Sequence, residues 1–294
     1  MPISWYPGHM LTARKDAVEA MGRTDVVIEV LDARAPHASC NPVIETLRKQ
    51  NRRPALKVLN KSDMADPERT REWLDYYNAQ PGVSAIAVSA KKASDVNRIP
   101  QEARKLVPAR ATAAKPFRMM ILGVPNVGKS TLMNALLKRR VAAVGDQPAI
   151  TKMHMGHPLG HGMWLVDTPG LVWPGMADAT AVKLAAIHSI GVNAYDDQNV
   201  AADLGQYLLT NYPQLVIKRY GPNTAGCDGH GLIAHVARSR NLLLKDGVYD
   251  LNKAAVAVLN EFRGGTLGRI TIETVEEVGG RSASAKAAPA VISS

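Results

Sequence analysis

The stretch ILGVPNVGKST (Ile121–Thr131) decides the fold. It contains the pattern G-x-x-x-x-G-K-[ST], in which a glycine-rich turn is followed by a lysine and a hydroxyl residue. The apolar run that leads into it, Phe117–Gly123, predicts a buried strand, and Ser130–Leu137 predicts a helix. A strand, a glycine-rich turn and a helix in this order predict a phosphate-binding loop in an α/β fold.

Each residue type in this loop has a chemical task. Gly123 and Gly128 allow backbone angles that turn successive N–H groups toward phosphates. Lys129 would neutralise the β- and γ-phosphates, and the Ser130 hydroxyl would complete the coordination of Mg²⁺. The predicted phosphate-binding residues are Asn126, Val127, Gly128, Lys129, Ser130 and Thr131.

The motif NKSD (Asn60–Asp63) indicates which base is bound. It ends a predicted buried strand, where ligand-binding loops of α/β sheets lie. The Asp63 carboxylate can accept two hydrogen bonds from guanine, which adenine does not offer in that geometry. Asn60 would brace the loop and the Lys61 stem would cover the base. The predicted base-binding residues here are Asn60, Lys61, Ser62 and Asp63.

A second loop, VSAKK (Val88–Lys92), supports the same ligand. Ser89 and Ala90 are its predicted binding residues, with the backbone N–H of Ala90 directed at the guanine oxygen. Each short string is a weak signal alone, but together with the phosphate-binding loop they predict GTP and GDP as ligands.

The motif DTPG (Asp167–Gly170) also ends a predicted strand. Asp167 is placed to hold Mg²⁺ through water, and the Gly170 N–H to contact the γ-phosphate. Thr151 is the candidate for the mobile threonine that closes on Mg²⁺ when GTP is bound, and the alternative is a loop threonine that faces solvent. The predicted magnesium ligands are therefore Ser130, Thr151 and Asp167.

Hydrophobic patterning divides the chain into two parts. Short apolar runs alternate with amphipathic segments up to about Pro174, which predicts a mostly parallel α/β sheet. Further strands are predicted at Asp25–Ala33, Ala55–Asn60, Val83–Ala90 and Met163–Gly170, and helices at Ala13–Met21, Val43–Gln50 and Glu68–Asn78. Lys105–Pro116, with its two prolines, is a predicted linker.

Helical periodicity dominates after Pro174, and a short strand at GRITIET, which includes Arg269, stays open. We expect an α/β domain at 1–177, a smaller all-α domain at 178–278 and a disordered tail at 279–294. The predicted helices of the second domain are Asp178–Ile190, Asn199–Asn211, Leu232–Ser239 and Leu251–Phe262.

Charge and composition narrow the class of protein. The first 177 residues carry 25 Lys and Arg against 15 Asp and Glu, whereas residues 178–294 carry 11 of each. The basic excess suits a polyanion such as RNA, and the alternative is that the basic runs are solvated helix faces. No apolar run is long enough to span a bilayer, MPISWYPGHM does not have the pattern expected of a signal peptide, and Cys40 and Cys227 match no metal spacing. We expect a cytoplasmic protein with free thiols, no membrane contact and a monomeric free state.

The order of the motifs is permuted. In GTPases of the Ras type the phosphate-binding loop comes first, whereas here NKSD and VSAKK precede it. A circular permutation preserves the site because the core of the sheet does not change. It also puts Gly170 close in the chain to the second domain, which would couple nucleotide state to domain posture.

With this order, WYPGHM (Trp5–Met10) and LNEFRGGTLGRITIE (Leu259–Glu273), the chain resembles the ribosome biogenesis GTPase A family from about Ser4 to Glu273. The resemblance implies GTP hydrolysis in late assembly of the bacterial large ribosomal subunit, with the helical domain contributing to ribosomal RNA binding. The family usually has Gly where this chain has Ala149, so the shape of that switch loop is an open question.

Hydrolysis needs a group that orients the attacking water. Leu171 stands where Ras-like enzymes have Gln, and its side chain makes no hydrogen bond. The resemblance implies that His9 takes this role as the catalytic residue; alternatives are that His9 binds RNA or caps a helix. Asn126 resembles the asparagine that coordinates K⁺ in related GTPases, and the alternative is that it only shapes the turn.

The leading hypothesis is a GTPase, stimulated by the ribosome, that binds the large subunit and its RNA. One alternative is a signalling GTPase that acts through protein effectors at a membrane, although the chain has no lipidation motif. Another is a GTP-binding RNA module with negligible hydrolysis, which the missing Gln favours.

Overall fold

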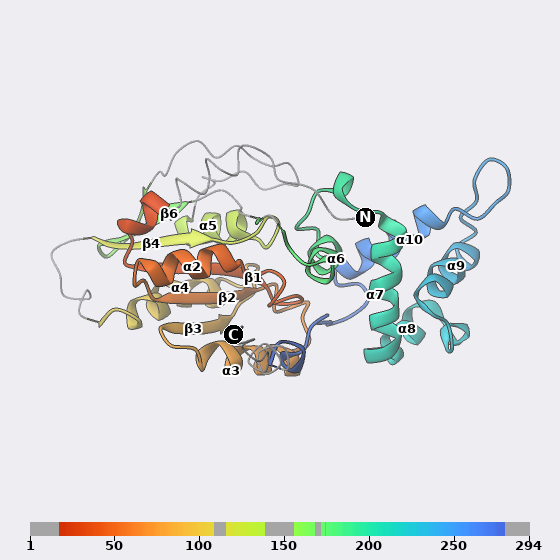
Figure 1. Cartoon of the computed structure of the whole chain (residues 1–294), viewed down its shortest axis with the longest axis horizontal. Helices are drawn as coiled ribbons and strands as arrows, with labels where there is room; N and C mark the ends of the chain where they lie inside the picture. The colour runs from red at the N-terminus through yellow and green to blue at the C-terminus, as the bar shows by residue number, and fades with distance from the viewer. Residues whose placement is uncertain (1–17, 109–115, 139–155, 168–171, 174, 280–294) are drawn as a thin grey trace, which may run out of the picture.

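The structure is a computed structural model that describes residues 18–108, 116–138, 156–167, 172–173 and 175–279. Six strands form one sheet in the order β3-β2-β1-β4-β6-β5, with every neighbouring pair parallel except the β5–β6 hairpin (Figure 1). The strands are β1 (Val26–Asp32), β2 (Ala55–Asn60), β3 (Val83–Ala87), β4 (Phe117–Leu122), β5 (Gly156–Gly160) and β6 (Met163–Asp167). The predicted α/β class with a mostly parallel sheet is confirmed.

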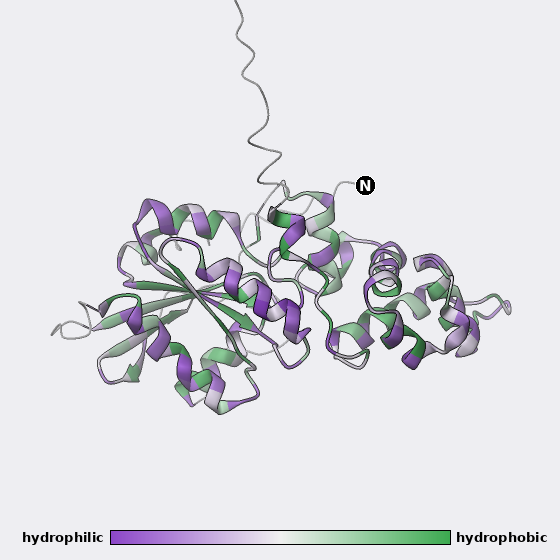
Figure 2. Ribbon diagram, turned by 90° about the horizontal axis from the view of Figure 1, so that it is seen from below, coloured by the Kyte–Doolittle hydropathy of each residue, from purple (hydrophilic) through white to green (hydrophobic). Residues whose placement is uncertain are grey.

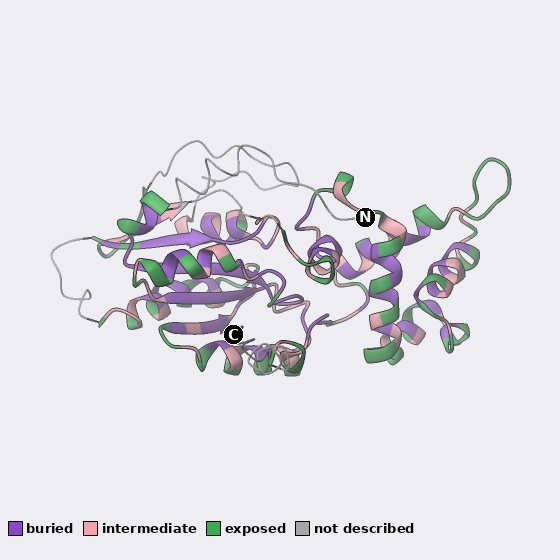
Figure 3. Ribbon diagram, viewed as in Figure 1, coloured by how far each residue is buried: buried purple, intermediate pink, exposed green. Residues whose placement is uncertain are grey.

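Helices cover both faces of this sheet. The side chains of a strand alternate between the two faces, so the apolar residues of one strand pack against helices on both. On central β1, Ile28 packs in the core that α4 and α5 complete, whereas Val27 packs with residues of α2. The central strands β1 and β2 are buried along their whole length between helices with mixed surfaces (Figures 2 and 3), whereas the edge strand β5 is partly exposed. These helices are α2 (Pro42–Gln50), α3 (Pro67–Asn78), α4 (Ala93–Lys105) and α5 (Lys129–Leu137).

The helix α4 is absent from the sequence prediction. It contains Pro100 in its interior and begins at a residue without a capping side chain, so the usual start and continuation signals are missing. The predicted linker at Lys105–Pro116 falls partly within this helix and partly outside the described residues.

The second part of the chain is helical, as predicted. Its apolar side chains share one core with those of the sheet, and Phe262 of the last helix is buried in it. The hairpin between α9 and α10 projects from the rest and is exposed (Figure 3). The helices are α6 (Asp178–Ala186), α7 (Asp197–Asn211), α8 (Pro213–Tyr220), α9 (Gly229–Ser239) and α10 (Leu251–Arg263), of which α8 was not predicted.

The chain after α10 returns to the sheet. Ile270 N–H donates to the Met64 carbonyl oxygen over 3.0 Å, and Ile272 N–H donates to the Arg34 carbonyl oxygen over 2.7 Å. The GRITIET stretch is therefore extended chain laid against the loops after β1 and β2, not a strand of the sheet. The helical part is therefore connected to the α/β part both by the chain that leads into α6 and by the chain that follows α10.

Candidate nucleotide-binding site

The loop between β4 and α5 has the backbone that its glycines predict. Gly123 has a φ of 150° and Gly128 a φ of 96°, in the region that side chains disfavour. A Cβ on Gly128 would also overlap the Asn60 Nδ2 atom. Gly128 is the N-cap of α5 and has no side chain to accept from the first N–H groups of that helix. Those N–H groups, at the positive end of the helix, make an anion site.

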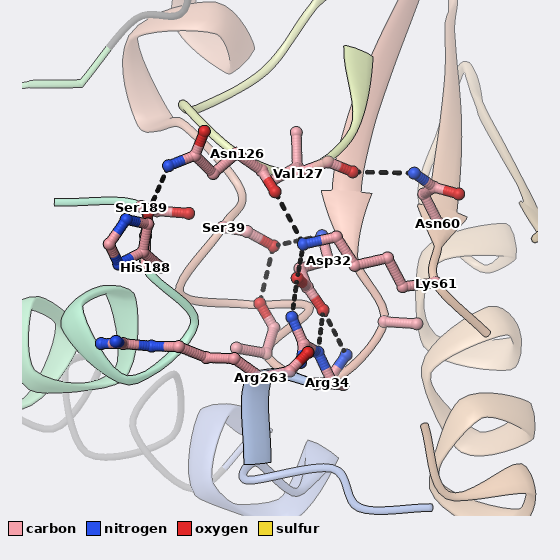
Figure 4. A network of polar contacts seen from close by, with 12 residues as sticks. Asp32, Arg34, Ser39, Asn60, Lys61, Asn126, Val127, His188, Ser189 and Arg263 are labelled. Carbon is pink, nitrogen blue, oxygen red and sulfur yellow. Dashed lines mark hydrogen bonds and ion pairs between the residues drawn. The ribbon is translucent and has the colours of Figure 1, made fainter. Parts of the chain in front are cut away.

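Asn60 ties the three predicted nucleotide loops together. Its Nδ2 donates to the Val127 carbonyl oxygen over 2.8 Å (Figure 4), and its Oδ1 accepts from the Ala90 N–H over 3.1 Å. The side chain is only 1% exposed, so these contacts are made away from solvent. The base-reading loop, the phosphate-binding loop and the VSAKK loop therefore meet at one place. The Ala90 N–H, expected at the guanine oxygen, is directed at Asn60 in this structure.

Lys61 bridges the base-reading loop to the phosphate-binding loop. Its Nζ lies 2.6 Å from the Asn126 carbonyl oxygen and 2.8 Å from Asp32 Oδ2. Lys61 and Asn126 both have positive φ angles, near 60°, in non-glycine residues. Such strained conformations gather at functional sites, where the surrounding contacts over-determine them.

Asp63 lies at the rim of the same loop cluster. Its Oδ2 accepts from Lys91 Nζ over 2.9 Å, and its side chain is 25% exposed. Partial burial works against ionisation, but hydrogen bonds from Lys91 and Ser89 hold the pKa of Asp63 below its usual value. A carboxylate that is ionised and reachable from solvent can accept hydrogen bonds from a base. Ser62 beside it donates its N–H to the Val88 carbonyl oxygen, which fixes the turn.

A cavity of about 450 Å³ opens beside these loops. Lys129 lies within it, 9% exposed, with its Nζ 2.8 Å from the Val124 carbonyl oxygen. The volume falls in the range of small-molecule pockets. The α/β side of the wall consists of Arg34, Lys61, Asn126, Gly128, Lys129, Ser130 and Thr131. It therefore includes every predicted phosphate-binding residue except Val127, together with Lys61 of the base-reading loop.

The opposite wall comes from the helical part, which the sequence did not predict. Asn126 Nδ2 donates to the His188 carbonyl oxygen over 2.7 Å (Figure 4), and Ser189 Oγ donates to the Pro125 carbonyl oxygen over 2.8 Å. Both contacts join the segment after α6 to the phosphate-binding loop. The wall residues from this part are Ile187, His188, Asn260 and Arg263.

The predicted magnesium and catalytic residues are described only in part. Ser130 stands in the first turn of α5 and lines the cavity. Asp167 ends β6, and its Cα pairs with that of Ile121 on β4, the strand that leads into the phosphate-binding loop. The Ser130 hydroxyl is an oxygen donor of the kind that Mg²⁺ prefers. The predicted residues His9, Thr151 and Gly170 lie outside the described residues.

The fold and the loops define a class: a P-loop GTPase in which the base-reading loop precedes the phosphate-binding loop. The family model for 50S ribosome-binding GTPases matches residues 118–215. That match begins in β4, where the phosphate-binding half starts, and leaves out the earlier residues that carry NKSD.

Relatives match over nearly the whole chain. Ribosome biogenesis GTPase A of Bacillus cereus is 37% identical over 95% of this chain and 96% of its own, and that of Thermotoga maritima is 29% identical over 94% and 96%. The GNP-bound structure of YlqF from T. maritima is similar with a TM-score of 0.64 and 26% identity, over 90% of this chain and 98% of that one. A GDP-bound structure of the same protein gives a TM-score of 0.62.

The chain belongs to the ribosome biogenesis GTPase A family. It is a GTPase that binds GTP and GDP and hydrolyses GTP, and a ribosome biogenesis factor. Among the described residues, no helix is long and apolar enough to cross a membrane.

Proposed function

We propose that this GTPase acts in late maturation of the large ribosomal subunit, where it binds ribosomal RNA and leaves after hydrolysis. Residues 1–177 form the nucleotide-binding domain in this proposal, and residues 178–278 the domain that contributes to RNA binding. The protein works as a cytoplasmic monomer that the ribosome stimulates. The family of the chain and the basic excess of its first 177 residues support the proposal.

The binding site follows from the junction at Asn60, which is the observation that carries it. GTP would lie with its phosphates in the cavity over the N-terminus of α5 and its guanine at Asp63. Lys129 neutralises the β- and γ-phosphates, while the Lys61 stem covers the base.

The metal site and the water site extend this pocket. Ser130, Thr151 and Asp167 would hold Mg²⁺, which when bound spreads the charge of the transferred phosphoryl group. Asn126 would hold K⁺ near the β–γ bridge, and His9 would orient the attacking water. The Gly170 N–H would contact the γ-phosphate, so that GTP and GDP bias the chain near the second domain differently.

Base specificity is tested at Asp63. In Asp63→Asn the amide can still accept from the N1–H of a purine, but it donates where the carboxylate accepted. We expect the variant to bind GDP at least tenfold more weakly and to bind xanthosine diphosphate more tightly than GDP, because xanthine has a carbonyl where guanine has an amino group. Calorimetric titration with both nucleotides measures the change. Equal affinity of the wild type for ATP and GTP would contradict the assignment.

The ribosomal role is tested by co-sedimentation with large subunits. Binding should require a non-hydrolysable GTP analogue and should weaken as salt rises, because contacts to phosphates release counterions. His9→Ala should lose most of the turnover that subunits stimulate while it keeps nucleotide binding. Unchanged turnover in that variant would refute the role of His9, and salt-independent binding would refute the RNA contact.

A further inference from the structure

Asp32, the last residue of β1, holds two cations in the wall of the nucleotide pocket. Arg34 binds it as a fork, with Nε 2.9 Å from Oδ1 and Nη2 2.8 Å from Oδ2. Lys61 Nζ lies 2.8 Å from the same Oδ2 (Figure 4). Burial alone would raise the pKa of Asp32, but the charges and hydrogen bonds of Arg34 and Lys61 hold it well below its usual range.

Arg34 reaches from this carboxylate to the end of the helical part. Its Nη1 donates to the carbonyl oxygens of Phe262 and Arg263, over 3.2 and 2.9 Å. Both carbonyls belong to the last turn of α10 and lie at its negative end, and the Phe262 carbonyl oxygen also accepts from the Gly265 N–H. The guanidinium also lies over the Phe262 ring, 5.2 Å from its centroid. The Arg34 side chain is 2% exposed, and only its contact with the Arg263 carbonyl oxygen is partly exposed.

Lys61 carries the connection on to the phosphate-binding loop. Its second contact is the Asn126 carbonyl oxygen, and Asn126 Nδ2 in turn donates to the His188 carbonyl oxygen. Arg263 connects the end of α10 back to this segment, because its side chain donates to the carbonyl oxygens of Ala185 and Ala186, at the end of α6. The contacts form a ring around the pocket that crosses between the α/β part and the helical part at two places, from Arg34 to the end of α10 and from Asn126 to His188.

We propose that Arg34 is a positioning residue for guanine-nucleotide binding: anchored on the end of α10, it orients Asp32, and Asp32 fixes Lys61 beside the base. This proposal rests on the proposed function of Lys61. A planar guanidinium is the group that can grip a carboxylate with one edge and two carbonyls with the other. The helical part thereby sets the affinity of a pocket whose sequence motifs all lie in the α/β part.

Two single variants and their combination test the order of action. Arg34→Ala should bind GDP about tenfold more weakly than the wild type, and Lys61→Ala by at least as much. If Arg34 acts through Lys61, the double variant Arg34→Ala/Lys61→Ala should bind GDP like Lys61→Ala alone. Calorimetric titration with GDP gives each affinity. A double variant weakened by the product of the two single effects would overturn the proposal, because Arg34 would then act on the nucleotide by itself or on the fold.

Arg48→Ala is the matched control. Arg48 is also a buried arginine, 4% exposed, that grips the carboxylate of Glu45 with Nε and Nη2, but on α2 and without a contact to the pocket. The Arg48→Ala variant should have a lower free energy of unfolding than the wild type, and its affinity for GDP should stay within twofold of the wild type. A drop of the same size as in Arg34→Ala would overturn the proposal, since any lost buried ion pair would then have that effect.

Arg34→Lys covers the case in which Arg34→Ala does not fold. An ammonium keeps a charge beside Asp32 but cannot also reach both carbonyls of α10. Its affinity for GDP should lie between those of the wild type and Lys61→Ala, and should equal the latter once Lys61→Ala is added. A wild type that binds no GDP would overturn the proposed function itself, whereas tight wild-type binding with independent effects would overturn only the role of Arg34.

Discussion

Strand β1 carries two buried ion clusters that differ in what they reach. Glu29 pairs with Lys57, its direct neighbour in the β1–β2 ladder, over 2.6 Å, and both side chains are 1% exposed. Cys40 Sγ lies 3.1 Å from the same Lys57 Nζ, and burial raises the pKa of this thiol to about 12. Asp32, three residues further along the strand, has its side chain on the opposite face at the end of the strand. Its partners reach the pocket and the helical part.

The difference teaches that the place of a buried charge along a strand decides its role. The Glu29 cluster lies in mid-strand, and the contacts described for it stay within the α/β part, away from the residues that line the pocket. Asp32 lies at the carboxyl end of a parallel strand, where ligand sites of such sheets form. The same kind of ion pair is a structural element in one place and part of a binding site in the other.

Lys57→Met tests the first half of this comparison and should give the largest effect. It leaves the buried Glu29 carboxylate without its ammonium partner, so the free energy of unfolding should fall by about 3–5 kcal/mol. Urea denaturation measures that loss. The folded fraction should bind GDP as the wild type does, because this cluster does not line the pocket. A loss of affinity at full folding would contradict the separation of the two clusters.

Gly128→Ala tests the pocket that Arg34 and Lys61 of the Asp32 cluster line, with a smaller effect on stability and a large one on binding. The new Cβ would overlap Asn60 Nδ2 in a backbone conformation that L-residues disfavour. Since Asn60 joins the three nucleotide loops, we expect the affinity for GDP to fall about 100-fold. The free energy of unfolding should fall by about 1–2 kcal/mol. Titration with GDP and urea denaturation measure the two effects. Gly247→Ala, at a positive φ in the exposed hairpin with open space around it, is the control that should leave GDP binding unchanged.

How much of this was predictable depends on the range of the contacts. The meeting of Asn60 with Val127 follows from local motifs, since both loops end parallel strands at one edge of a sheet. The role of Arg34 does not, because its partners Phe262 and Arg263 lie more than two hundred residues along the chain. In the sequence, DARAP reads only as the end of a strand followed by a turn. No local rule reveals which distant carbonyls an arginine will meet.

The secondary-structure prediction missed one helix and left one stretch open where the local signals were weak. The short helix α8 has eight residues and starts at Pro213, so it shows barely two turns of periodicity. The GRITIET stretch has the composition of a strand, but its hydrogen bonds go to loops: Thr271 Oγ1 donates to the Ala33 carbonyl oxygen, and Arg269 donates to that of Ala65. Tertiary partners, not propensity, decided this segment.

A third ion cluster, in the helical part, extends the comparison to partial exposure. Glu261 on α10 accepts from Arg219, Arg240 and Tyr220. Glu261 is 13% exposed, but Arg219 and Arg240 are 39% and 31% exposed, so solvent screens the pair. Although partial burial opposes it, these hydrogen bonds lower the pKa of Glu261 to about 2.

Glu261→Gln should therefore show the smallest effect, with a definite dependence on pH. A carboxylate whose folded-state pKa is lowered contributes stability that is fully present above its unfolded pKa and is lost as pH falls through the folded pKa. We expect the wild type to be more stable than the variant by about 1 kcal/mol at pH 7, with the difference shrinking below the ordinary value of 4.5 and gone near pH 2. Urea denaturation between pH 7 and pH 3 measures it, with Glu19→Gln as the control because its ion pair with Arg23 is about 70% exposed on both sides. A difference that stays constant over this range would mean that Glu261 stabilises the fold by packing and not by its charge. The exposure of an ion cluster would then not predict the size of its effect on stability.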